Sequence, residues 1–335
     1  MKKAFIVLLS LLMLAFALTA CSIVAGYSNA NMPTYTRVEE DIILFGEYPQ
    51  TKVTDTTLAS TLNNVAGTLP TSTNAHNWTS YGYYIEGKIR NFMWYIDVVN
   101  GKNKYRGVYF ISYRPYDQNY DGNSADDTYQ DDNGYLVSNI YWFKYEPIFW
   151  TILEEKDGKA FLLCDMIMDS QEFDYENGRF YNNYADSTIR RWLNDTFYNT
   201  AFNQYEQEIV LTTTVDNRGE SAGYDTNKYA CEDTEDKVFL LSYVEVVDYL
   251  GFYEYSMKKT TDYAQSQGVY TYSGSRESYL GVGGWWLRSP HHYNHYSQRV
   301  GSVGHYYSYD DVQGRGEGYV YDSYYGVVPA LWIQL

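Results

Sequence analysis

Residues 291–325 concentrate side-chain types that are well suited to binding a ligand. Fifteen of the 21 residues from His291 to Asp311 are Tyr, His, Asn, Asp or Ser, and nine of the chain's 40 tyrosines lie within 291–325. Tyrosine offers a rigid ring with a polar tip at low entropic cost, and the other four types add adaptable hydrogen bonds. The composition predicts a ligand-binding face, with a polar, twisted Tyr/Gly sheet as the alternative. The predicted contact residues are His291, His292, Tyr293, Asn294, His295, Tyr296, His305, Tyr306, Tyr307, Tyr309, Asp310, Asp311, Tyr319, Tyr321, Tyr324 and Tyr325.

Two groups of residues have the side chains of metal ligands. Asp117, Asn119 and Asp121, followed by Gly122, match the first half of an acidic calcium loop, but its twelfth position is Thr128 instead of glutamate. These three residues are a weak calcium candidate, with a solvated acidic loop as the alternative, and no cofactor is required. The histidines at positions 291, 292, 295 and 305 fall in an expected loop after a proline, which disfavours zinc because zinc ligands need a rigid support.

No arrangement of residues predicts catalysis, so we expect a binding protein that is not an enzyme. The chain has no Gly-x-Ser-x-Gly elbow and no histidine between positions 77 and 290. Its 42 acidic residues make carboxylate pairs by chance, so their abundance is no sign of a glycosidase. Two alternatives stay open. One is a carbohydrate-active enzyme of the cell envelope that uses a carboxylate pair, and the other is a structural envelope protein.

The first 21 residues predict export and lipidation. Met1-Lys2-Lys3 precedes an apolar run that is too short to span a membrane stably, and small residues lead to Cys21. The sequence 18–21, Leu-Thr-Ala-Cys, resembles the lipobox of bacterial lipoproteins, in which the cysteine is acylated. This resemblance implies a signal peptide at 1–20, lipidation of Cys21 and a flexible tether at 21–40. The protein would then face outward from the outer membrane of a two-membrane cell, or otherwise from the cell membrane.

Charge and cysteine content limit the partners. Removal of residues 1–20 deletes two of the 25 basic residues and none of the 42 acidic ones, so the mature charge is 23 − 42 = −19. This charge excludes a nucleic acid held through its phosphates and leaves the lipid anchor as the expected contact with a membrane. An extracellular protein or a glycan is the expected ligand.

Cys164 and Cys231 could pair outside the cell, or Cys164 could be a free thiol in the core.

Apolar periodicity and turn signals predict the elements that position these residues. Asn100-Gly101 and Asp157-Gly158 indicate hairpin turns, and Ser187 is a plausible helix N-cap. Few and short helices among many strands predict an α+β fold that is mainly antiparallel, with much irregular structure. Strands are expected at 41–50, 92–99, 105–113, 147–153, 160–168, 237–242, 285–290 and 327–333, and short helices at 58–65, 187–197 and 243–250.

Six motifs carry a resemblance to a large family of bacterial exported proteins without assigned activity. They begin at Phe45 (FGxYPQ), Pro147 (PIxW), Ser187 (STIRxWLN), Asp236 (DKVFLLS), Trp285 (WWLRSP) and Pro329 (PALWI). The family in turn resembles the formylglycine-generating-enzyme branch of the C-type lectin fold. The resemblance implies one C-type-lectin-like domain at 41–335 with an insertion at about 51–145. The catalytic cysteine pair of those enzymes is missing, because no cysteine follows Cys231, and Val328 replaces an arginine found in related chains.

The five residue types enriched in 291–325 also share a coding property. An Asn codon changed only at its adenines yields Tyr, His, Asp and Ser by single steps. This pattern resembles the target proteins of diversity-generating retroelements, which vary adenines near the end of a gene for a C-type lectin fold. The resemblance implies a receptor or adhesin-like lipoprotein on the cell surface whose segment 291–325 is variable.

Overall fold

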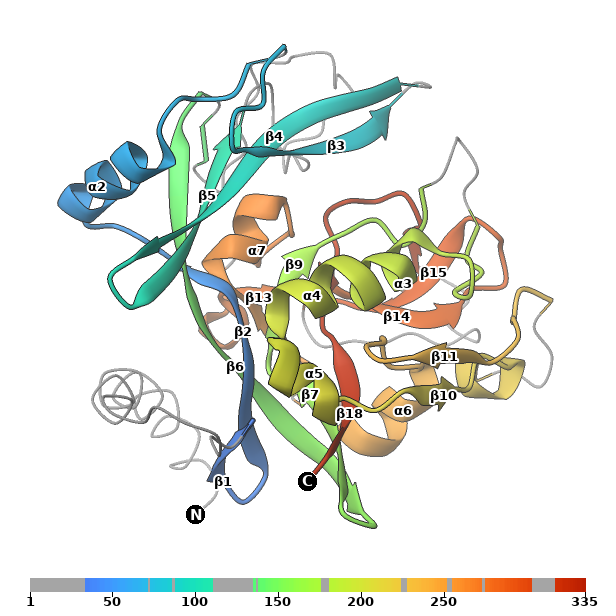
Figure 1. Cartoon of the computed structure of the whole chain (residues 1–335). Coiled ribbons are helices and arrows are strands. Elements are labelled where there is room, and N and C mark those ends of the chain that lie inside the picture. The colour runs from blue at the N-terminus through green and yellow to red at the C-terminus, as the bar shows by residue number, and fades with distance from the viewer. Residues whose placement is uncertain are drawn as a thin grey trace. The chain divides into compact units, whose positions relative to one another are not determined.

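The largest sheet of the computed structural model contains eight strands, and every pairing within it is antiparallel (Figure 1). These strands are β1 (Thr36–Glu39), β2 (Ile42–Lys52), β3 (Thr79–Ile85), β4 (Lys88–Asn100), β5 (Asn103–Phe110), β6 (Ile140–Lys156), β7 (Lys159–Cys164) and β18 (Ala330–Gln334). Their order is β1-β2-β6-β5-β4-β3, and β7 and β18 continue the sheet from β6. The long strand β6 pairs with β2, β5 and β7, so it joins the N-terminal strands to the C-terminal half of the chain.

The structure describes residues 34–71, 73–85, 88–110, 135–136, 138–175, 181–223, 228–251, 255–272, 275–302 and 317–335. Tyr35–Leu335 form one compact unit. The signal peptide, Cys21 and the predicted tether up to residue 33 lie outside the described residues, so these remain predictions. The tether was predicted to extend to residue 40, but Thr36–Glu39 form strand β1, which pairs with β2. No helix among the described residues is long and apolar enough to cross a membrane.

Three smaller sheets lie in the C-terminal half. Their strands are β8 (Met166–Ile167), β9 (Asp169–Ser170), β10 (Thr213–Val215), β11 (Thr234–Asp236), β12 (Lys258–Thr260), β13 (Val282–Gly283), β14 (Trp285–Pro290), β15 (Tyr296–Val300), β16 (Glu317–Tyr319) and β17 (Gly326–Val327). One sheet pairs β10 with β11, a second has the order β13-β12-β8, and a third has the order β16-β15-β14-β17-β9. Strands β15 and β16 of the third sheet lie within the predicted binding segment.

The described helices are short. They are α2 (Thr56–Ala66), α3 (Thr188–Trp192), the π-helical turn η1 (Leu193–Phe197), α4 (Tyr198–Ala201), α5 (Gln204–Ile209), the 3₁₀ turn η2 (Gly219–Ala222), α6 (Tyr243–Glu245), the π-helical turn η3 (Val246–Leu250), α7 (Asp262–Gln267) and the 3₁₀ turn η4 (Glu277–Tyr279). Ser187 caps α3 as expected, because its hydroxyl accepts a hydrogen bond from the Arg190 amide at 3.3 Å. Ile189, Leu193 and Phe197 then share a buried face. The prediction of an α+β, mainly antiparallel chain is confirmed.

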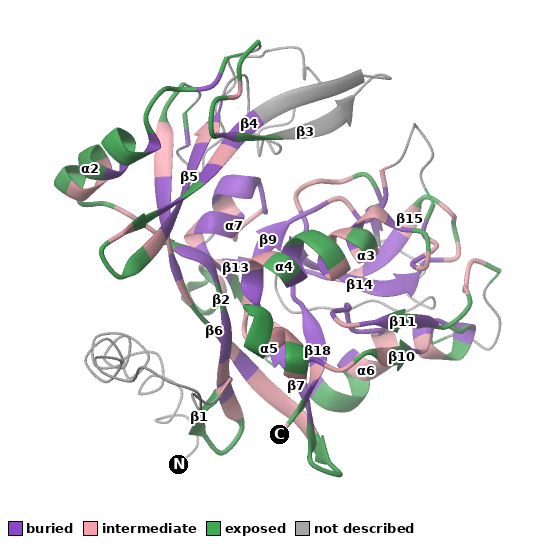
Figure 2. Cartoon of the chain, viewed as in Figure 1, coloured by how far each residue is buried: buried purple, intermediate pink, exposed green. Residues whose placement is uncertain are grey.

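Two hydrophobic clusters fill the unit. The larger one joins the main sheet to the helices and to the buried strand β14 (Figure 2). The smaller one forms between α2 and the β4–β5 hairpin and contains Leu62, Trp78, Trp94 and Trp142. The smaller cluster lies entirely within residues 51–145. For this segment we expected only the helix at 58–65 and the strands at 92–99 and 105–113. The segment also contributes β3 and the start of β6 to the main sheet.

The strand expected at 237–242 is absent, because a side chain takes its backbone hydrogen bonds. The Oδ1 atom of Asn194 accepts from the amides of Lys237 at 2.8 Å and Val238 at 3.2 Å, and its Nδ2 atom donates to the Val238 carbonyl at 2.9 Å. Phe239 forms an isolated bridge to Ala330, and the Leu241 carbonyl accepts the Arg288 amide of β14 at 3.0 Å, but no ladder of pairs forms along the segment. A partner more than 40 residues away thus overrides the local β pattern.

Cys164 and Cys231 are both free thiols in the structure, so they form no disulfide. Cys164 ends the buried strand β7, as the core-thiol interpretation predicted. Burial raises its pKa to about 12, which keeps the thiol protonated and unreactive.

Candidate functional site

An exposed group of rings lies where β15 pairs with β16. Tyr296 and Tyr319 are opposite each other in this antiparallel pair, and their ring centroids are 4.3 Å apart. Tyr319 stacks on Tyr321 at 5.0 Å and on His295 at 5.9 Å. The exposed fractions are 54% for Tyr293, 39% for Tyr319 and 39% for Tyr321. We call these five residues, Tyr293, His295, Tyr296, Tyr319 and Tyr321, the aromatic face.

The buried side chain of Asn182 holds the backbone beneath this face. Its Nδ2 atom donates to the carbonyl oxygens of His291 at 2.8 Å, Tyr293 at 2.9 Å and Tyr296 at 2.8 Å. Its own amide donates to the Asn294 carbonyl at 2.9 Å. Asn182 was not predicted, and no local pattern marks it, because its partners lie more than 100 residues away. These bonds fix the positions of the rings before any ligand arrives, which lowers the entropic cost of binding.

Of the other predicted contact residues that the structure describes, some are partly exposed and others are buried. Asn294 is partly exposed, and its Oδ1 atom is 2.9 Å from Nδ1 of His295. His292 and Tyr324 are also partly exposed. His291 is buried beneath the loop, and burial together with the charges of His292 and His295 lowers its pKa to about 4.

Tyr325 belongs to the core instead of the aromatic face. It is 8% exposed, and its ring centroid is 4.6 Å from that of Trp286 in an edge-on contact. A Cβ atom at Gly318 would lie 2.3 Å from the Tyr325 ring, so only glycine lets β16 approach so closely. The remaining contact predictions, at positions 305, 306, 307, 309, 310 and 311, fall outside the described residues.

The metal predictions are not tested by the structure. Asp117, Asn119 and Asp121, the weak calcium candidate, lie outside the described residues. Within the described ranges there is no group of three or more His, Cys, Asp or Glu residues that could hold a metal ion.

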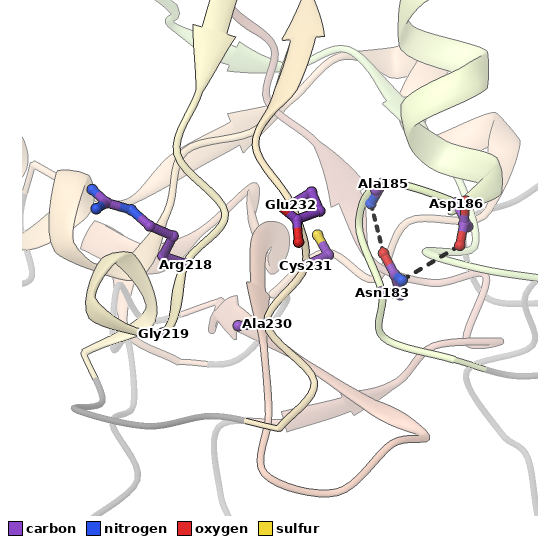
Figure 3. Close-up of a pocket in the computed structure, with 8 residues that line it drawn as sticks. All are labelled: Asn183, Ala185, Asp186, Arg218, Gly219, Ala230, Cys231 and Glu232. Atoms are coloured by element: carbon purple, nitrogen blue, oxygen red, sulfur yellow. Dashed lines mark hydrogen bonds between the residues drawn. The ribbon is translucent and has the colours of Figure 1, made fainter.

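A pocket of about 600 Å³ opens beside the loop that follows Asn182. Figure 3 shows Cys231 between Glu232 and the loop that carries Asn183 and Asp186. The other lining residues are Ala185, Arg218, Gly219 and Ala230. Burial raises the pKa of the Cys231 thiol, and no histidine is among the residues that line the pocket. Burial thus favours the protonated form of this thiol.

Comparison with known protein families identifies a family match in the C-terminal half of the chain. Residues 157–335 match the model of a domain of unknown function, DUF6273. The chain belongs to this family. No curated protein and no solved structure matches the chain. The DUF6273 region begins in the β6–β7 turn and includes Asn182, the aromatic face and the pocket, but none of residues 51–145.

Several motif residues of the DUF6273 region form a buried polar framework. The Nε atom of Arg190 donates to Oδ1 of Asp236 at 2.7 Å, and Nδ2 of Asn194 donates to the same oxygen at 3.2 Å. Arg288 is ion-paired to Glu245 and donates to the Leu240 carbonyl at 2.7 Å. These residues hold segments together and face inward. The motifs therefore mark the scaffold, while the exposed rings lie between them.

A second buried polar network joins the DUF6273 region to the N-terminal strands. Arg106 on β5 pairs with Asp97 on β4 through two hydrogen bonds of 2.8 Å, and its Nη1 atom lies 3.4 Å from the hydroxyl of Tyr263 on α7. Burial acts to raise the pKa of Asp97, but the hydrogen bonds and charge of Arg106 outweigh it and lower the pKa. Tyr145 donates to the same carboxylate at 2.8 Å. The network therefore connects β4, β5 and β6 to α7.

Asp169, on β9, is expected to make stability depend on pH. Burial raises its pKa from 3.8 to about 6, although Tyr48 and the Ser170 amide each donate to it at 2.7 Å. Because its pKa is higher in the folded chain than in the unfolded chain, protonation of Asp169 stabilises the fold. This contribution is complete below about pH 4 and is lost as the pH rises through about 6. The loss amounts to about 3 kcal/mol. Urea unfolding of the wild type and Asp169→Asn between pH 4 and 7 measures it. The wild type should lose stability relative to the variant over this range, and parallel curves would contradict the assignment.

Proposed function

We propose that this protein is a ligand-binding lipoprotein of the bacterial cell surface, in which the aromatic face contacts a protein or glycan outside the cell. The observation that carries the proposal is the exposure of the Tyr293, Tyr319 and Tyr321 rings on a face where Asn182 fixes the backbone of residues 291–296. Exposed rings on a rigid support provide contact area at little entropic cost, as in antibody combining sites. The strongly acidic chain argues against nucleic acid as the ligand.

The architecture and location are part of the proposal. We infer a C-type-lectin-like arrangement from the tryptophan-rich strand β14, the polar segment after it and the closing strand β18, which pairs with β7. The motif at Cys21 supports lipidation and an outward-facing position, with Ca²⁺ as an optional ligand at Asp117, Asn119 and Asp121. The site is proposed to act by contact alone, without a catalytic residue.

Removing two rings of the aromatic face should abolish most of the binding. The double variant Tyr293→Ser/Tyr321→Ser deletes exposed rings whose stacking or packing on a ligand is worth about 1 kcal/mol or more each, so affinity should fall at least about tenfold. The measurement is binding of the full-length chain to protein and glycan arrays, followed by titration of each ligand found.

A matched control tests whether the loss of binding is specific to the aromatic face or follows the loss of any two exposed tyrosines. Tyr205 and Tyr255 are 71% and 75% exposed and lie outside the aromatic face. Tyr205→Ser/Tyr255→Ser should bind as the wild type does. Equal binding by the face variant and the wild type would contradict the proposed site.

Diversification of residues 291–325 is a further part of the proposal and has its own test. Sequencing the 3′ end of the gene from many cells of one culture should show substitutions confined to adenine positions in these codons. It should also find a near-copy of the segment in the flanking DNA. An invariant segment with no such copy would reduce the proposal to a fixed binding surface.

A further inference from the structure

Tyr181 is an exposed tyrosine outside the predicted binding segment, and backbone hydrogen bonds attach it to the aromatic face. Its neighbour Asn182 is 1% exposed and turns inward, whereas the side chain of Tyr181 is 50% exposed and turns outward. The Asn182 amide donates to the Asn294 carbonyl at 2.9 Å. Because Asn294 lies between Tyr293 and His295 in the chain, Tyr181 is adjacent to the part of the aromatic face that these two residues form.

A second pair of hydrogen bonds attaches Tyr181 to the other part of the aromatic face. The Tyr181 amide donates to Oδ2 of Asp174 at 3.2 Å, and the Asp174 amide donates to the Val320 carbonyl at 2.9 Å. Val320 lies between Tyr319 and Tyr321 in the chain. Asp174 is 7% exposed, so this link is shielded from solvent. The position of Tyr181 is therefore fixed relative to both parts of the aromatic face.

The ring of Tyr181 is available to a ligand. Among the residues that the structure describes, none is in ring contact with Tyr181 or hydrogen-bonded to its hydroxyl. Half of the side chain is exposed, so a ligand can reach the ring without displacing another aromatic side chain. A tyrosine held on a fixed backbone in this way is suited to anchoring a binding partner.

The stacked rings of the aromatic face present their edges instead of their faces. Tyr319 stacks on Tyr321 with an interplanar angle of 21° and on His295 with an angle of 17°. Stacked rings turn their faces toward one another, so Tyr319 presents its edge and its hydroxyl to solvent. The edge of an aromatic ring carries a partial positive charge, and its face carries a partial negative charge. A ligand group with a π face is therefore attracted to these edges.

We propose that Tyr181 is a contact residue of this binding surface and that it binds an aromatic side chain of a protein ligand. The inference rests on the proposed function, to which it adds a contact residue and the class of the ligand. An aromatic ring can stack on Tyr181 and receive the edge of Tyr319 on its own face, since such pairs form with centroids about 4.5 to 7 Å apart. A sugar ring can stack on Tyr181 but has no π face for the edge. Tyr181 lies outside residues 291–325, so it stays the same if that segment varies.

Saturation-transfer NMR of the full-length chain with three small probes tests the class of the ligand. N-acetyl-tryptophan N-methylamide carries an aromatic ring, N-acetyl-leucine N-methylamide has an apolar side chain without a ring, and methyl β-glucopyranoside is a sugar ring. The tryptophan probe should bind, and the other two should give no signal at the same concentration. No signal from the tryptophan probe, or an equal signal from either of the others, would overturn the inference.

Variants at Tyr181 locate the interaction. Tyr181→Leu keeps an apolar side chain but removes the ring, so the affinity for the tryptophan probe should fall about fivefold. Tyr181→Phe keeps the ring and should bind as the wild type does. Both substitutions leave the backbone amide in place, so the unfolding midpoints in urea should match that of the wild type.

Tyr205→Leu is the matched control. Tyr205 is 71% exposed, and its amide donates to Oδ1 of Asn203 at 2.9 Å, much as the Tyr181 amide donates to Asp174. This variant should bind the tryptophan probe as the wild type does. Undiminished binding by Tyr181→Leu, or an equal loss in Tyr205→Leu, would show that Tyr181 does not hold the probe.

The outcomes separate this inference from the proposed function. If array ligands depend on Tyr293 and Tyr321 but the tryptophan probe is insensitive to Tyr181→Leu, the proposed function stands and Tyr181 is not a contact residue. If the tryptophan probe depends on Tyr181 but array ligands bind Tyr293→Ser/Tyr321→Ser as they bind the wild type, Tyr181 forms an aromatic-binding site and the aromatic face is not the contact surface.

Discussion

Asn182→Asp is expected to lower the free energy of unfolding by about 4 kcal/mol. The Nδ2 atom of Asn182 lies 2.8 to 2.9 Å from the carbonyl oxygens of His291, Tyr293 and Tyr296, and those of Tyr293 and Tyr296 also accept a backbone amide at 3.2 Å. In the variant an acceptor oxygen replaces this donor. A carboxylate at this buried position would face three carbonyl dipoles of the same sign, and a protonated carboxyl would satisfy only one of them. The substitution keeps the size and shape of the side chain, so the effect isolates hydrogen bonding.

Urea unfolding followed by tryptophan fluorescence measures this change. Asn183→Asp is the matched control, because the next residue is only partly buried and donates no hydrogen bond to the 291–296 backbone. Its unfolding midpoint should stay close to that of the wild type. A midpoint for Asn182→Asp within error of the wild type would show that other contacts hold the loop. The variant should also lose binding on the aromatic face under conditions where it stays folded, since Tyr293 and Tyr296 lose their support.

Arg288→Leu is the second change expected to have a large effect, again about 4 kcal/mol. The Arg288 side chain is 2% exposed, pairs with both oxygens of Glu245 and donates to the carbonyls of Leu240 at 2.7 Å and Asp216 at 3.2 Å. Leucine is shorter than arginine and leaves these acceptors without their donor. Arg288→Lys should be intermediate, because an ammonium group cannot reproduce the fork of donors.

Arg218→Leu provides the comparison for Arg288→Leu. Both arginines contact Asp216, but Arg218 is exposed and pairs with the carboxylate, whereas Arg288 is buried and binds the carbonyl. Solvent screens the exposed pair, so the unfolding midpoint of Arg218→Leu should not change. Equal midpoints for the two leucine variants would refute the view that Arg288 holds β14 to α6 and to the segment around Asp216.

Local pattern predicted most of the described elements because hairpins and short helices depend on neighbouring residues. Asn100-Gly101 and Asp157-Gly158 each lie in the turn of an antiparallel pair, as expected, and Ser187 caps its helix. The same reasoning failed at 237–242, where Asn194 takes the backbone hydrogen bonds. It also missed β3, whose placement depends on pairing with β4 rather than on its own short pattern.

The sequence by itself determined the acidic charge, the α+β composition and the segment in which Tyr, His, Asn, Asp and Ser are concentrated, since these depend on residue types and short spacings. Only the tertiary structure decided which rings of that segment are exposed. Tyr293, Tyr319 and Tyr321 reach the surface, while Tyr325 packs on Trp286. It also brought Asn182 beneath the loop and formed the pocket from three separate segments, residues 183–186, 218–219 and 230–232. Burial and long-range hydrogen bonds depend on which segments pack together, and no local spacing encodes that.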